Sequence, residues 1–204
     1  MFYRFVRALI RLLAVIFFRW EVKGADHMPR AGGAILAANH VSLLDPLFVG
    51  TTVKRKVHYM AKEELFKIPV LGGVITALGA FPVRRGAADR QAIREALRLL
   101  EAGEVVGIFP EGTRSIDGEL QKAQSGIALL ATRANVPVVP ALIVGSEKVM
   151  RKGSRLPRPA KIRVFIGPPV KLTVEDGKGA EKDKLEVLSV RIMEAIATLK
   201  SQIG

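Results

Sequence analysis

The sequence predicts an α/β fold with a mixed, mainly parallel sheet flanked by helices, and three observations lead to that expectation. Apolar segments typical of buried strands alternate along the chain with segments of helical periodicity. Turns that contain proline and glycine separate the segments, without an internal repeat or a low-complexity linker. The chain has 204 residues, which suffices to bury one core without a disulfide or metal staple, so one α/β domain is expected over residues 21–204.

The first twenty residues depart from that alternation and predict an amphipathic helix that lies in a membrane interface. They are rich in Phe, Leu, Ile and Val, and four arginines fall within about a third of a helical wheel, namely Arg4, Arg7, Arg11 and Arg19. Their longest uncharged run, residues 12–18, is much shorter than the roughly 20 residues of a spanning helix. A core helix and a signal peptide are the alternatives, although a signal peptide requires a longer apolar region and a small-residue cleavage site.

The elements of the α/β domain are expected in a definite order. A short strand over residues 21–24 and a turn precede a buried strand over residues 33–40, which ends at His40. Asp45 then begins a helix as its N-cap, with Pro46 at the first helical position. The later elements are a strand and short helix within residues 56–66, a strand turning into a loop over 79–86, strands over 105–109, 136–145 and 161–170, and helices over 88–102, 126–135 and 185–200.

Three remaining segments are interpreted from composition. Residues 68–83 carry no charge, but their prolines and glycines argue against a membrane span, so they are expected to form an apolar surface or groove, with plain core as the alternative. Residues 175–184 predict an exposed loop. Seven basic residues and no acidic one lie between Lys148 and Arg163, which favours either a solvated face or a site for anionic lipid headgroups or an acidic acyl donor.

Composition narrows the class of partner. The net charge of +13 favours a polyanionic partner, and 49% hydrophobic residues with a mean hydropathy of +0.24 favour a membrane surface. Two tyrosines and one tryptophan offer little equipment for stacking on nucleic-acid bases. The absence of cysteine excludes a disulfide framework, a thiolate zinc site and a cysteine nucleophile, and three scattered histidines argue against any metal site.

His40 and Asp45 form the first candidate site. They follow the carboxyl end of a buried strand, which is where α/β sheets place functional residues. A carboxylate on one imidazole nitrogen fixes the tautomer and leaves the other nitrogen as a base. The alternatives are a structural histidine and a plain N-cap, and the sequence does not separate the two roles of Asp45. Neither Ser42 nor Ser125 lies in a G-x-S-x-G elbow, so the base is expected to act on a hydroxyl of the substrate.

Two further polar clusters follow apolar strands. The loop after residues 105–109 presents Glu111, Gly112, Thr113 and Arg114. Gly112 allows the backbone to approach a ligand, and Arg114 offers two parallel hydrogen bonds to a phosphate. Arg84 and Arg85 follow the strand at residues 79–83. Each cluster alone is most often a solvated turn, but three clusters that each follow an apolar strand indicate one site.

The blocks "NHVSLLDP", "GAFPVRRG", "FPEGTRS" and "VPVVPALI" resemble, in order and spacing, the four motif blocks of the glycerolipid acyltransferases. They look most like the blocks of the bacterial enzymes that acylate 1-acyl-glycerol-3-phosphate. The matching residues are Asn39, His40 and Asp45, then Gly79, Phe81 and Arg85, then Phe109 to Ser115, then Val136, Pro137 and Pro140. The resemblance covers about residues 20–170. Arg84 is a departure, because many relatives carry an acidic residue there, and its role is left open.

The resemblance implies transfer of a fatty acyl group from acyl-CoA or acyl carrier protein to the 2-hydroxyl of lysophosphatidic acid, which gives phosphatidic acid without an acyl-enzyme. It makes His40 the general base and Asp45 its partner. It assigns the glycerol phosphate to Glu111, Gly112, Thr113, Arg114 and Arg85, with Lys62 as a weaker candidate. No metal, cofactor or nucleic acid is expected. An enzyme of this kind is expected at the cytoplasmic face of the cell membrane, as a monotopic or peripheral protein bound to an anionic surface.

Three alternatives stay open. The first is acylation of another lysolipid or of the sn-1 position, because the four blocks do not fix the acceptor. The second is a basic nucleic-acid-binding module, suggested by the charge of +13, which would leave the His40 and Glu111 blocks unexplained. The third is a hydrolase that uses the same base on water and releases free fatty acid.

Overall fold

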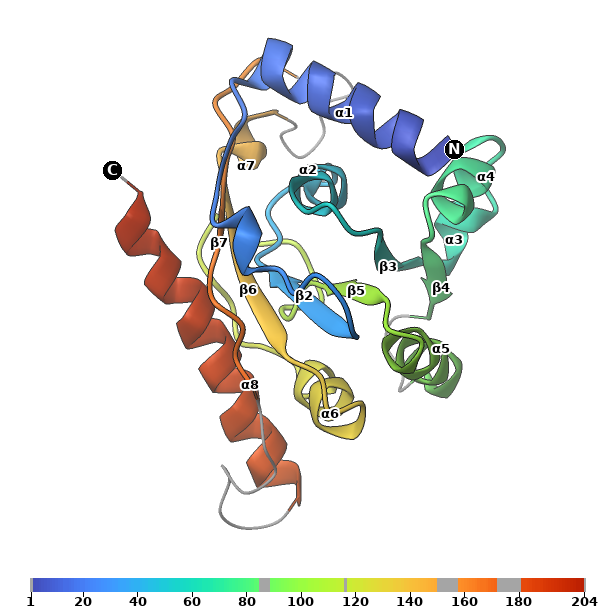
Figure 1. The fold of residues 1–204 in the computed structure, drawn as a ribbon, viewed down its shortest axis with the longest axis vertical. Helices are drawn as coiled ribbons and strands as arrows, with labels where there is room; N and C mark the ends of the chain where they lie inside the picture. Colours follow the sequence, from blue (N-terminus) through green and yellow to red (C-terminus); the bar gives the residue numbers. More distant parts are fainter. Residues whose placement is uncertain (1, 85–88, 116, 150–157, 172–180, 204) are drawn as a thin grey trace.

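The structure is a computed structural model that describes residues 2–84, 89–115, 117–149, 158–171 and 181–203. In this part of the chain one seven-stranded sheet lies between helices on its two faces (Figure 1). The strands are β1 (Glu21–Lys23), β2 (Ala34–Ala38), β3 (Val57–Lys62), β4 (Phe81–Val83), β5 (Val105–Ile108), β6 (Val138–Val144) and β7 (Arg163–Ile166). The helices are α1 (Phe2–Phe18), α2 (Asp45–Thr52), α3 (Glu63–Phe66), α4 (Leu71–Ala77), α5 (Arg90–Glu101), α6 (Gly126–Arg133), α7 (Ser146–Val149) and α8 (Glu181–Thr198), with 3-10 turns at Ala25–His27 and Leu199–Gln202.

The strand order β1-β7-β6-β2-β5-β3-β4 places β2 at the centre of the sheet. β6, β2, β5, β3 and β4 run parallel, and β7 is antiparallel to β6, so the predicted mixed, mainly parallel sheet is confirmed. All five residues of β2 are buried, and a strand covered on both faces has the uninterrupted apolar sequence seen in "AILAA". The carboxyl ends of β2, β5 and β3 therefore meet at one edge of the sheet.

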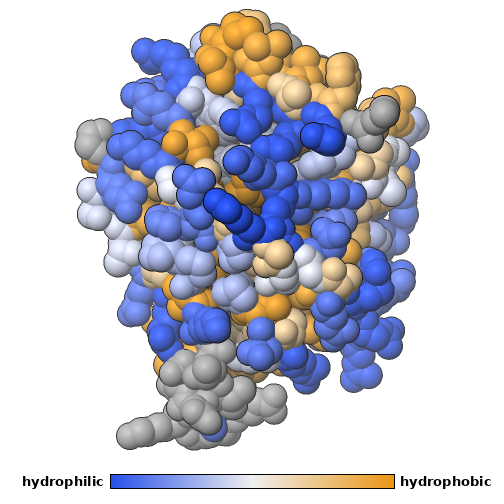
Figure 2. Space-filling view, in the orientation of Figure 1, coloured by the Kyte–Doolittle hydropathy of each residue, from blue (hydrophilic) through white to orange (hydrophobic). Residues whose placement is uncertain are grey.

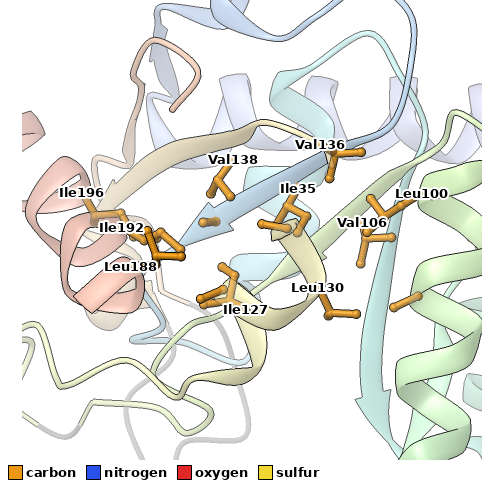
Figure 3. Packing of buried hydrophobic residues seen from close by; sticks show 14 of the residues in the cluster. Ile35, Leu100, Val106, Ile127, Leu130, Val136, Val138, Leu188, Ile192 and Ile196 are labelled. Atoms are coloured by element: carbon orange, nitrogen blue, oxygen red, sulfur yellow. The ribbon is translucent and has the colours of Figure 1, made fainter. Parts of the chain in front are cut away.

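Helices α5, α6 and α8 cover one face of the sheet. Figure 3 shows the packing of Ile35, Val106 and Val138 of the sheet with Leu100, Ile127, Leu130, Leu188, Ile192 and Ile196 of the helices. The last three lie four residues apart on α8, so they form one stripe that faces the sheet. Gly103 has a φ of 80° and lies just after the C-cap of α5, where a left-handed residue commonly ends a helix.

The opposite face of the sheet carries α2 and, outside it, α1. Phe48 and Val49 of α2 belong to the core cluster on this face, together with Leu36 of β2. Phe18 at the end of α1 meets the Phe48 ring edge-on at 5.4 Å, and Ala14 is buried. Through these contacts one narrow side of α1 packs against the rest of the molecule, and most of the helix surface is exposed.

The arginine stripe of α1 flanks that seated side. Arg7 donates to the Lys54 carbonyl at 3.1 Å, and the Arg11 guanidinium lies 5.5 Å from the centre of the Trp20 ring. The outward side exposes large apolar side chains, namely Phe2, Phe5, Leu9, Leu12, Leu13, Val15, Ile16 and Phe17. Figure 2 shows an orange surface at the top of the molecule, where α1 lies in Figure 1. The amphipathic helix predicted within residues 1–20 is present as α1, and its place in a membrane interface stays a prediction.

Three segments interpreted from composition have different outcomes. Residues 175–180 of the predicted loop and 150–157 of the basic run lie outside the described residues. Helix α8 begins at Glu181, so the end of the predicted loop is wrong, because acidic residues suit a first helical turn and Leu185 continues the apolar stripe. Residues 68–83 contain α4 and β4, and Ile68, Val70 and Leu71 are exposed, which confirms the expected apolar surface there. Among the described residues, no helix has the length and apolarity needed to cross a bilayer.

Candidate active site

Two loops at the carboxyl edge of the sheet bring the first and third motif blocks together. β2 ends at Ala38 and is followed by Asn39 and His40, while β5 ends at Ile108 and is followed by Phe109. The two strands are parallel neighbours, with Ala37 paired to Ile108. The loops are also joined directly, because the Ser115 amide donates to the His40 carbonyl at 2.8 Å.

Asp45 holds one nitrogen of His40. The His40 Nδ1 lies 3.0 Å from the Asp45 Oδ2, and the two residues are 7% and 0% exposed. A carboxylate accepts hydrogen bonds, so this contact selects the tautomer with the proton on Nδ1. The Nε2 lone pair of His40 is then available to a substrate proton, which is the arrangement required of a general base.

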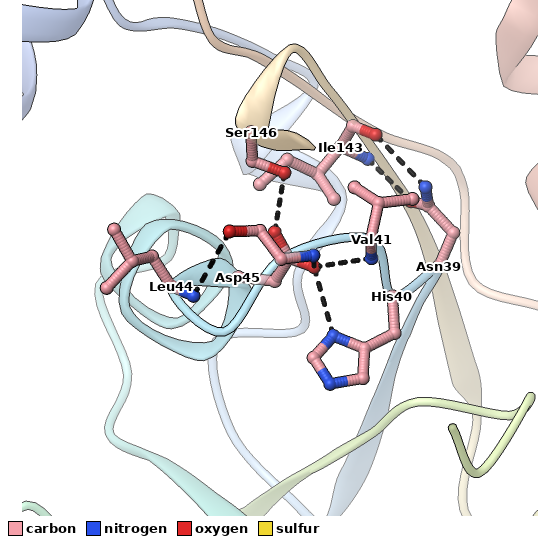
Figure 4. A network of polar contacts seen from close by, with 8 residues as sticks. Asn39, His40, Val41, Leu44, Asp45, Ile143 and Ser146 are labelled. Atoms are coloured by element: carbon pink, nitrogen blue, oxygen red, sulfur yellow. Dashed lines mark hydrogen bonds and ion pairs between the residues drawn. The ribbon is translucent and has the colours of Figure 1, made fainter. Parts of the chain in front are cut away.

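The Asp45 carboxylate is compensated by three further donors (Figure 4). Its Oδ2 accepts from the amides of Val41 and Ser42, each at 2.7 Å, and its Oδ1 accepts from the Ser146 Oγ at 2.6 Å. A fully buried carboxylate without donors would carry a large desolvation cost, and four hydrogen bonds offset it. The charge that faces His40 is therefore held in one position.

The structure corrects one sequence-based assignment at Asp45. The residue was expected to be the N-cap of the following helix, but it is the first residue of α2 and Leu44 precedes the helix. Its side chain turns back to the amides of Val41 and Ser42 instead of the first turn of α2. Pro46 has no amide proton, so the helix start needs one donor fewer to be satisfied. The two alternatives for Asp45 are thus separated in favour of the partner of His40.

Asn39 and Ser146 were not among the predicted site residues. The Asn39 amide donates to the Ile143 carbonyl at 3.0 Å and accepts from the Ile143 amide at 2.8 Å, which pins the loop after β2 to β6. Ser146 is the first residue of α7, which follows β6, and its hydroxyl donates a hydrogen bond to Asp45. The match of Asn39 to the first motif block was a usable signal for this residue, whereas nothing in the sequence indicates that Ser146 reaches Asp45.

A stack of three rings supports the imidazole of His40. The His40 and Phe109 rings are 4.1 Å apart at an angle of 20°, and Tyr59 of β3 stacks behind Phe109 at 5.7 Å and 17°. Gly107 makes room for the stack, because a Cβ there would lie 2.2 Å from the Tyr59 ring. The Tyr59 hydroxyl is buried without a hydrogen-bond partner among the described residues, and burial raises its pKa, so it stays neutral.

Glu111 is the second buried carboxyl group of the site, and its surroundings differ from those of Asp45. Glu111 is 5% exposed, and neither of its carboxyl oxygens has a hydrogen bond to a described residue. Burial raises the pKa of Glu111 to about 7, although nearby backbone amides of His40 and Gln121 lower it in part. Near neutral pH this side chain is therefore divided between a hydrogen-bond donor form and a charged form.

The other predicted substrate-binding residues are placed unequally. Gly112 has a φ of 72°, and its amide donates to the Phe109 carbonyl at 3.0 Å in a tight turn. Thr113 and Arg114 follow that turn and are exposed. Lys62, at the end of β3, is half exposed and pairs with Glu64 at 3.0 Å. Arg85 lies outside the described residues, so its predicted role is not addressed by the structure.

Arg84 has a contact that bears on its open role. Its guanidinium binds Glu63 of α3 at 2.8 Å, and its amide donates to Asp89, which caps α5. These bonds tie the end of β4 to the helices on either side of it. The ion pair with Glu63 is a contact specific to a basic side chain, whereas the bond to Asp89 is made by the backbone amide.

Comparison with known proteins adds a family and several relatives. The family model described as "Acyltransferase" matches residues 19–144. The chain is 27% identical over 202 residues to the 1-acyl-sn-glycerol-3-phosphate acyltransferase of Bacillus subtilis, which covers 98% of both chains. It is 34% identical over 153 residues to an enzyme of the same name from Limnanthes alba and 29% identical over 174 residues to the chloroplastic one from Brassica napus.

The chain covers nearly the whole length of the Bacillus subtilis relative but only part of the plant relatives. The chain spans 54% of the Limnanthes alba protein and 50% of the Brassica napus protein, about half the length of these plant relatives. Among solved structures, it is similar to the crystal structure of the 1-acyl-sn-glycerophosphate (LPA) acyltransferase from Thermotoga maritima. The TM-score is 0.75 at 30% sequence identity, over 97% of this chain and 81% of that one.

Proposed function

Because the chain belongs to the acyltransferase family, we propose that it transfers a fatty acyl group to the 2-hydroxyl of 1-acyl-glycerol-3-phosphate and so makes phosphatidic acid. The relatives named for this reaction support the choice of acceptor, above all the Bacillus subtilis protein, which aligns over 98% of both chains. The acyl donor is a thioester, either acyl-CoA or acyl carrier protein. Both are anionic, which suits a chain with a net charge of +13.

One observation carries the mechanism, which is the buried contact of 3.0 Å between His40 and Asp45. His40 Nε2 takes the proton of the acceptor hydroxyl while the oxygen attacks the thioester carbonyl carbon. A C–O bond forms, and the tetrahedral intermediate then expels the thiolate by breaking its C–S bond. The thiolate leaves as a thiol with the proton held by His40, so the histidine returns to its neutral form and no acyl-enzyme is needed.

The surroundings of His40 suit the charge that this step creates. The imidazolium would lie between the Asp45 carboxylate and the face of the Phe109 ring, 4.1 Å away. An aromatic face attracts a cation, so both neighbours stabilise the charged intermediate form of the histidine. The hydrogen bonds that fix Asp45 are already formed in the protein, which reduces the reorganisation required during the reaction.

The loop after β5 is proposed to bind the glycerol phosphate. Arg114 is exposed beside the turn at Gly112 and makes no ion pair with a described residue, so its guanidinium is free to bind phosphate oxygens. Glu111 is buried near the backbone of His40, and this burial raises the pKa of its carboxyl group. Its protonated form can donate a hydrogen bond to a glycerol oxygen, and its charged form can accept one from a glycerol hydroxyl. Arg85 and Lys62 remain proposed as further phosphate contacts.

The outward side of α1 is proposed to place this site at the surface of a membrane. Phe5 is 68% exposed, Leu12 is 56% exposed and Ile16 is 60% exposed on one side of the helix, while Arg4 and Arg11 lie at its border. This is the arrangement of a helix that lies in the interface with its cations at headgroup level. The acceptor and product of the proposed reaction are membrane lipids, so we place the enzyme at the cytoplasmic face of the cell membrane as a monotopic or peripheral protein.

The test uses purified protein, labelled oleoyl-CoA and 1-acyl-glycerol-3-phosphate, with a His40→Ala variant in parallel and the lipid products separated. We expect phosphatidic acid from the wild type and none from the variant. If acyl-CoA gives no product, loaded acyl carrier protein is the second donor to supply, and failure of both donors contradicts the proposed reaction. An equally active variant would contradict the role of His40, and free fatty acid released without acceptor would identify a hydrolase.

Control acceptors in the same assay decide between the proposed reaction and its neighbours. Glycerol 3-phosphate tests acylation of the sn-1 position, and 1-acyl-glycerophosphocholine tests another lysolipid. We expect 1-acyl-glycerol-3-phosphate to be the preferred acceptor by its kcat/KM.

A further inference from the structure

The turn between α3 and α4 carries an apolar surface that the proposed reaction does not use. Ile68 is 45% exposed, Val70 is 83% exposed and Leu71 is 38% exposed. Residues 68–83 contain no charged side chain, so nothing polar within the turn compensates this exposure. Isolated exposed apolar residues are common, but three at one protruding turn form a patch that needs a partner.

The backbone at the tip of this turn is strained. Val70 has a φ of 66° and a ψ of −53°, and the Leu71 amide donates to the Pro69 carbonyl at 2.7 Å across it. This is a γ-turn with a positive φ at its centre, a rare conformation that is unfavourable for a β-branched residue. The chain thus holds a valine in a costly backbone conformation and directs its side chain into solvent. An observed outlier of this kind points to a function.

The turn is also built as a fixed unit. Gly72 lets α4 cross α3 closely, because a Cβ there would lie 2.2 Å from the Phe66 carbonyl oxygen. The amides of Gly72 and Val74 donate to the carbonyls of Ile68 and Val70 at 2.9 and 3.0 Å. These bonds continue α4 directly from the strained residue, so the apolar tip is presented at one position.

We propose that this turn, residues 68–71, inserts into the same lipid surface as α1, so that the enzyme contacts the membrane at two separate points. The inference rests on the proposed membrane placement of α1. Figures 1 and 2 show α4 and the outward side of α1 on the same side of the molecule, each with an apolar surface. Both segments lack acidic residues, and Arg4 and Arg11 of α1 supply cations for anionic headgroups.

The position of the turn gives the second contact a purpose. α3 begins directly after β3, whose carboxyl end lies at the edge of the sheet that carries His40. Leu43, in the loop between His40 and Asp45, is 52% exposed. One amphipathic helix holds the molecule along a single line, so the rest of the molecule can still rock toward or away from the bilayer, whereas a second contact away from that line restricts this motion. The two contacts would hold the His40 edge of the sheet at the level of the lipid headgroups.

The experiment uses the absence of cysteine, which lets one introduced thiol carry one environment-sensitive fluorophore on the full chain. Val70→Cys reports the turn and Leu13→Cys reports α1. Val187→Cys is the matched control, a valine on α8 that is 45% exposed. The probe membrane is a vesicle of phosphatidylethanolamine and phosphatidylglycerol. We expect the emission of the first two labels to shift to the blue on adding vesicles and that of the third to stay unchanged.

Unlabelled variants measure how much the turn contributes. Val70→Asn removes the apolar side chain and introduces a residue type that tolerates a positive φ. We expect it to bind the vesicles about tenfold more weakly than the wild type, in line with the burial of one valine side chain. Val187→Asn should bind unchanged.

The outcomes separate the two proposals. A shift at position 13 without one at position 70 overturns the second contact and keeps the first. No shift at either position overturns the membrane placement of α1 as well. A shift at position 70 that appears on raising the protein concentration without vesicles would assign the turn to a second copy of the chain, and so would overturn the inference.

Discussion

The loops after β2 and β5 lie side by side at one edge of the sheet, yet their buried carboxyl groups differ in the number of hydrogen bonds that they accept. Asp45 receives four hydrogen bonds, from His40, two backbone amides and Ser146. The carboxyl oxygens of Glu111 have no hydrogen-bond partner among the described residues, and burial raises its pKa to about 7 although the backbone amides of His40 and Gln121 lower it in part. A buried polar group is normally satisfied, and an exception calls for an explanation. The difference supports the proposals that His40 and Asp45 form the base without a further group and that the loop after β5 binds the substrate.

The largest predicted effect breaks the satisfied loop. In Asp45→Asn the NH2 group would face either the three donors at the Oδ2 position, His40 among them, or the Ser146 hydroxyl at the Oδ1 position. In both orientations the negative charge that holds the proton of His40 on Nδ1 would be lost. We expect kcat to fall roughly ten-thousandfold, as for the histidine base of a Ser-His-Asp triad whose aspartate is changed to asparagine. Steady-state kinetics on 1-acyl-glycerol-3-phosphate measure it, with circular dichroism to confirm folding. A folded variant within tenfold of the wild type would show that the pair does not form the base.

The second prediction concerns Glu111 and the pH dependence of stability. Its folded pKa of about 7 lies above the usual 4.5, so the folded state keeps a proton that the unfolded state loses as pH rises between these values. Stability from this group is therefore present at low pH and is lost through pH 7. In the wild type, this group should lower the free energy of unfolding by on the order of 2 kcal/mol between pH 5 and pH 8. We expect this decrease to be absent in Glu111→Gln.

Urea unfolding of both proteins at the two pH values measures that difference. Glu119→Gln is the control, because Glu119 is an exposed carboxylate whose side chain pairs with Lys200 at the surface. An unchanged pH dependence in Glu111→Gln would mean that the Glu111 carboxyl group is solvated, and the contrast with Asp45 would then disappear.

The third prediction tests the ring that joins the two loops. Phe109→Leu keeps an apolar side chain but removes the face that stacks on His40 at 4.1 Å. We expect kcat to fall about fivefold to tenfold with little change in KM, since such ring contacts contribute about 1 kcal/mol. Tyr59→Phe keeps the stack and removes an unpartnered hydroxyl, so it should be fully active and no less stable. A rise in KM with unchanged kcat in Phe109→Leu would place the ring in substrate binding instead.

The smallest predicted effect removes one donor from the satisfied loop. Ser146→Ala deletes the hydrogen bond to the Asp45 Oδ1 and leaves the three bonds on Oδ2 intact. We expect a loss in kcat of about twofold to fivefold and about 1 kcal/mol in the free energy of unfolding. A loss as large as that of Asp45→Asn would mean that Ser146, rather than the backbone amides, sets the position of the carboxylate.

The sequence predicted most of the fold because its signals are local. The run "AILAA" predicts a buried strand, and the periodicity of residues 88–102 predicts α5, which spans Arg90–Glu101. The four motif blocks predicted the acyltransferase family, and this prediction is confirmed. The end of the 175–184 loop was wrong because a polar first turn of a helix has the same composition as a loop.

What the sequence did not predict depends on contacts between distant segments. Ser146 reaches Asp45 across 101 positions, and Asn39 binds Ile143 across 104 positions. The direction of the Asp45 side chain is set by a loop conformation, and no residue pattern distinguishes it from an N-cap. The strain at Val70 was equally hidden, because a valine between Pro69 and Leu71 gives no signal for a positive φ.

The central place of β2 has a consequence for how the protein acquires activity. Its neighbours β5 and β6 lie far along the chain, and both must pair with β2 in parallel before His40, Asp45 and Ser146 meet. Parallel pairing of distant segments requires the closure of long loops and makes folding slow. A chain emerging from the ribosome therefore cannot complete the sheet around His40 and Asp45 until β6 has been synthesised and has paired with β2. Enzymatic activity regained during refolding should accordingly follow formation of the whole central sheet, with no active partly folded species before it.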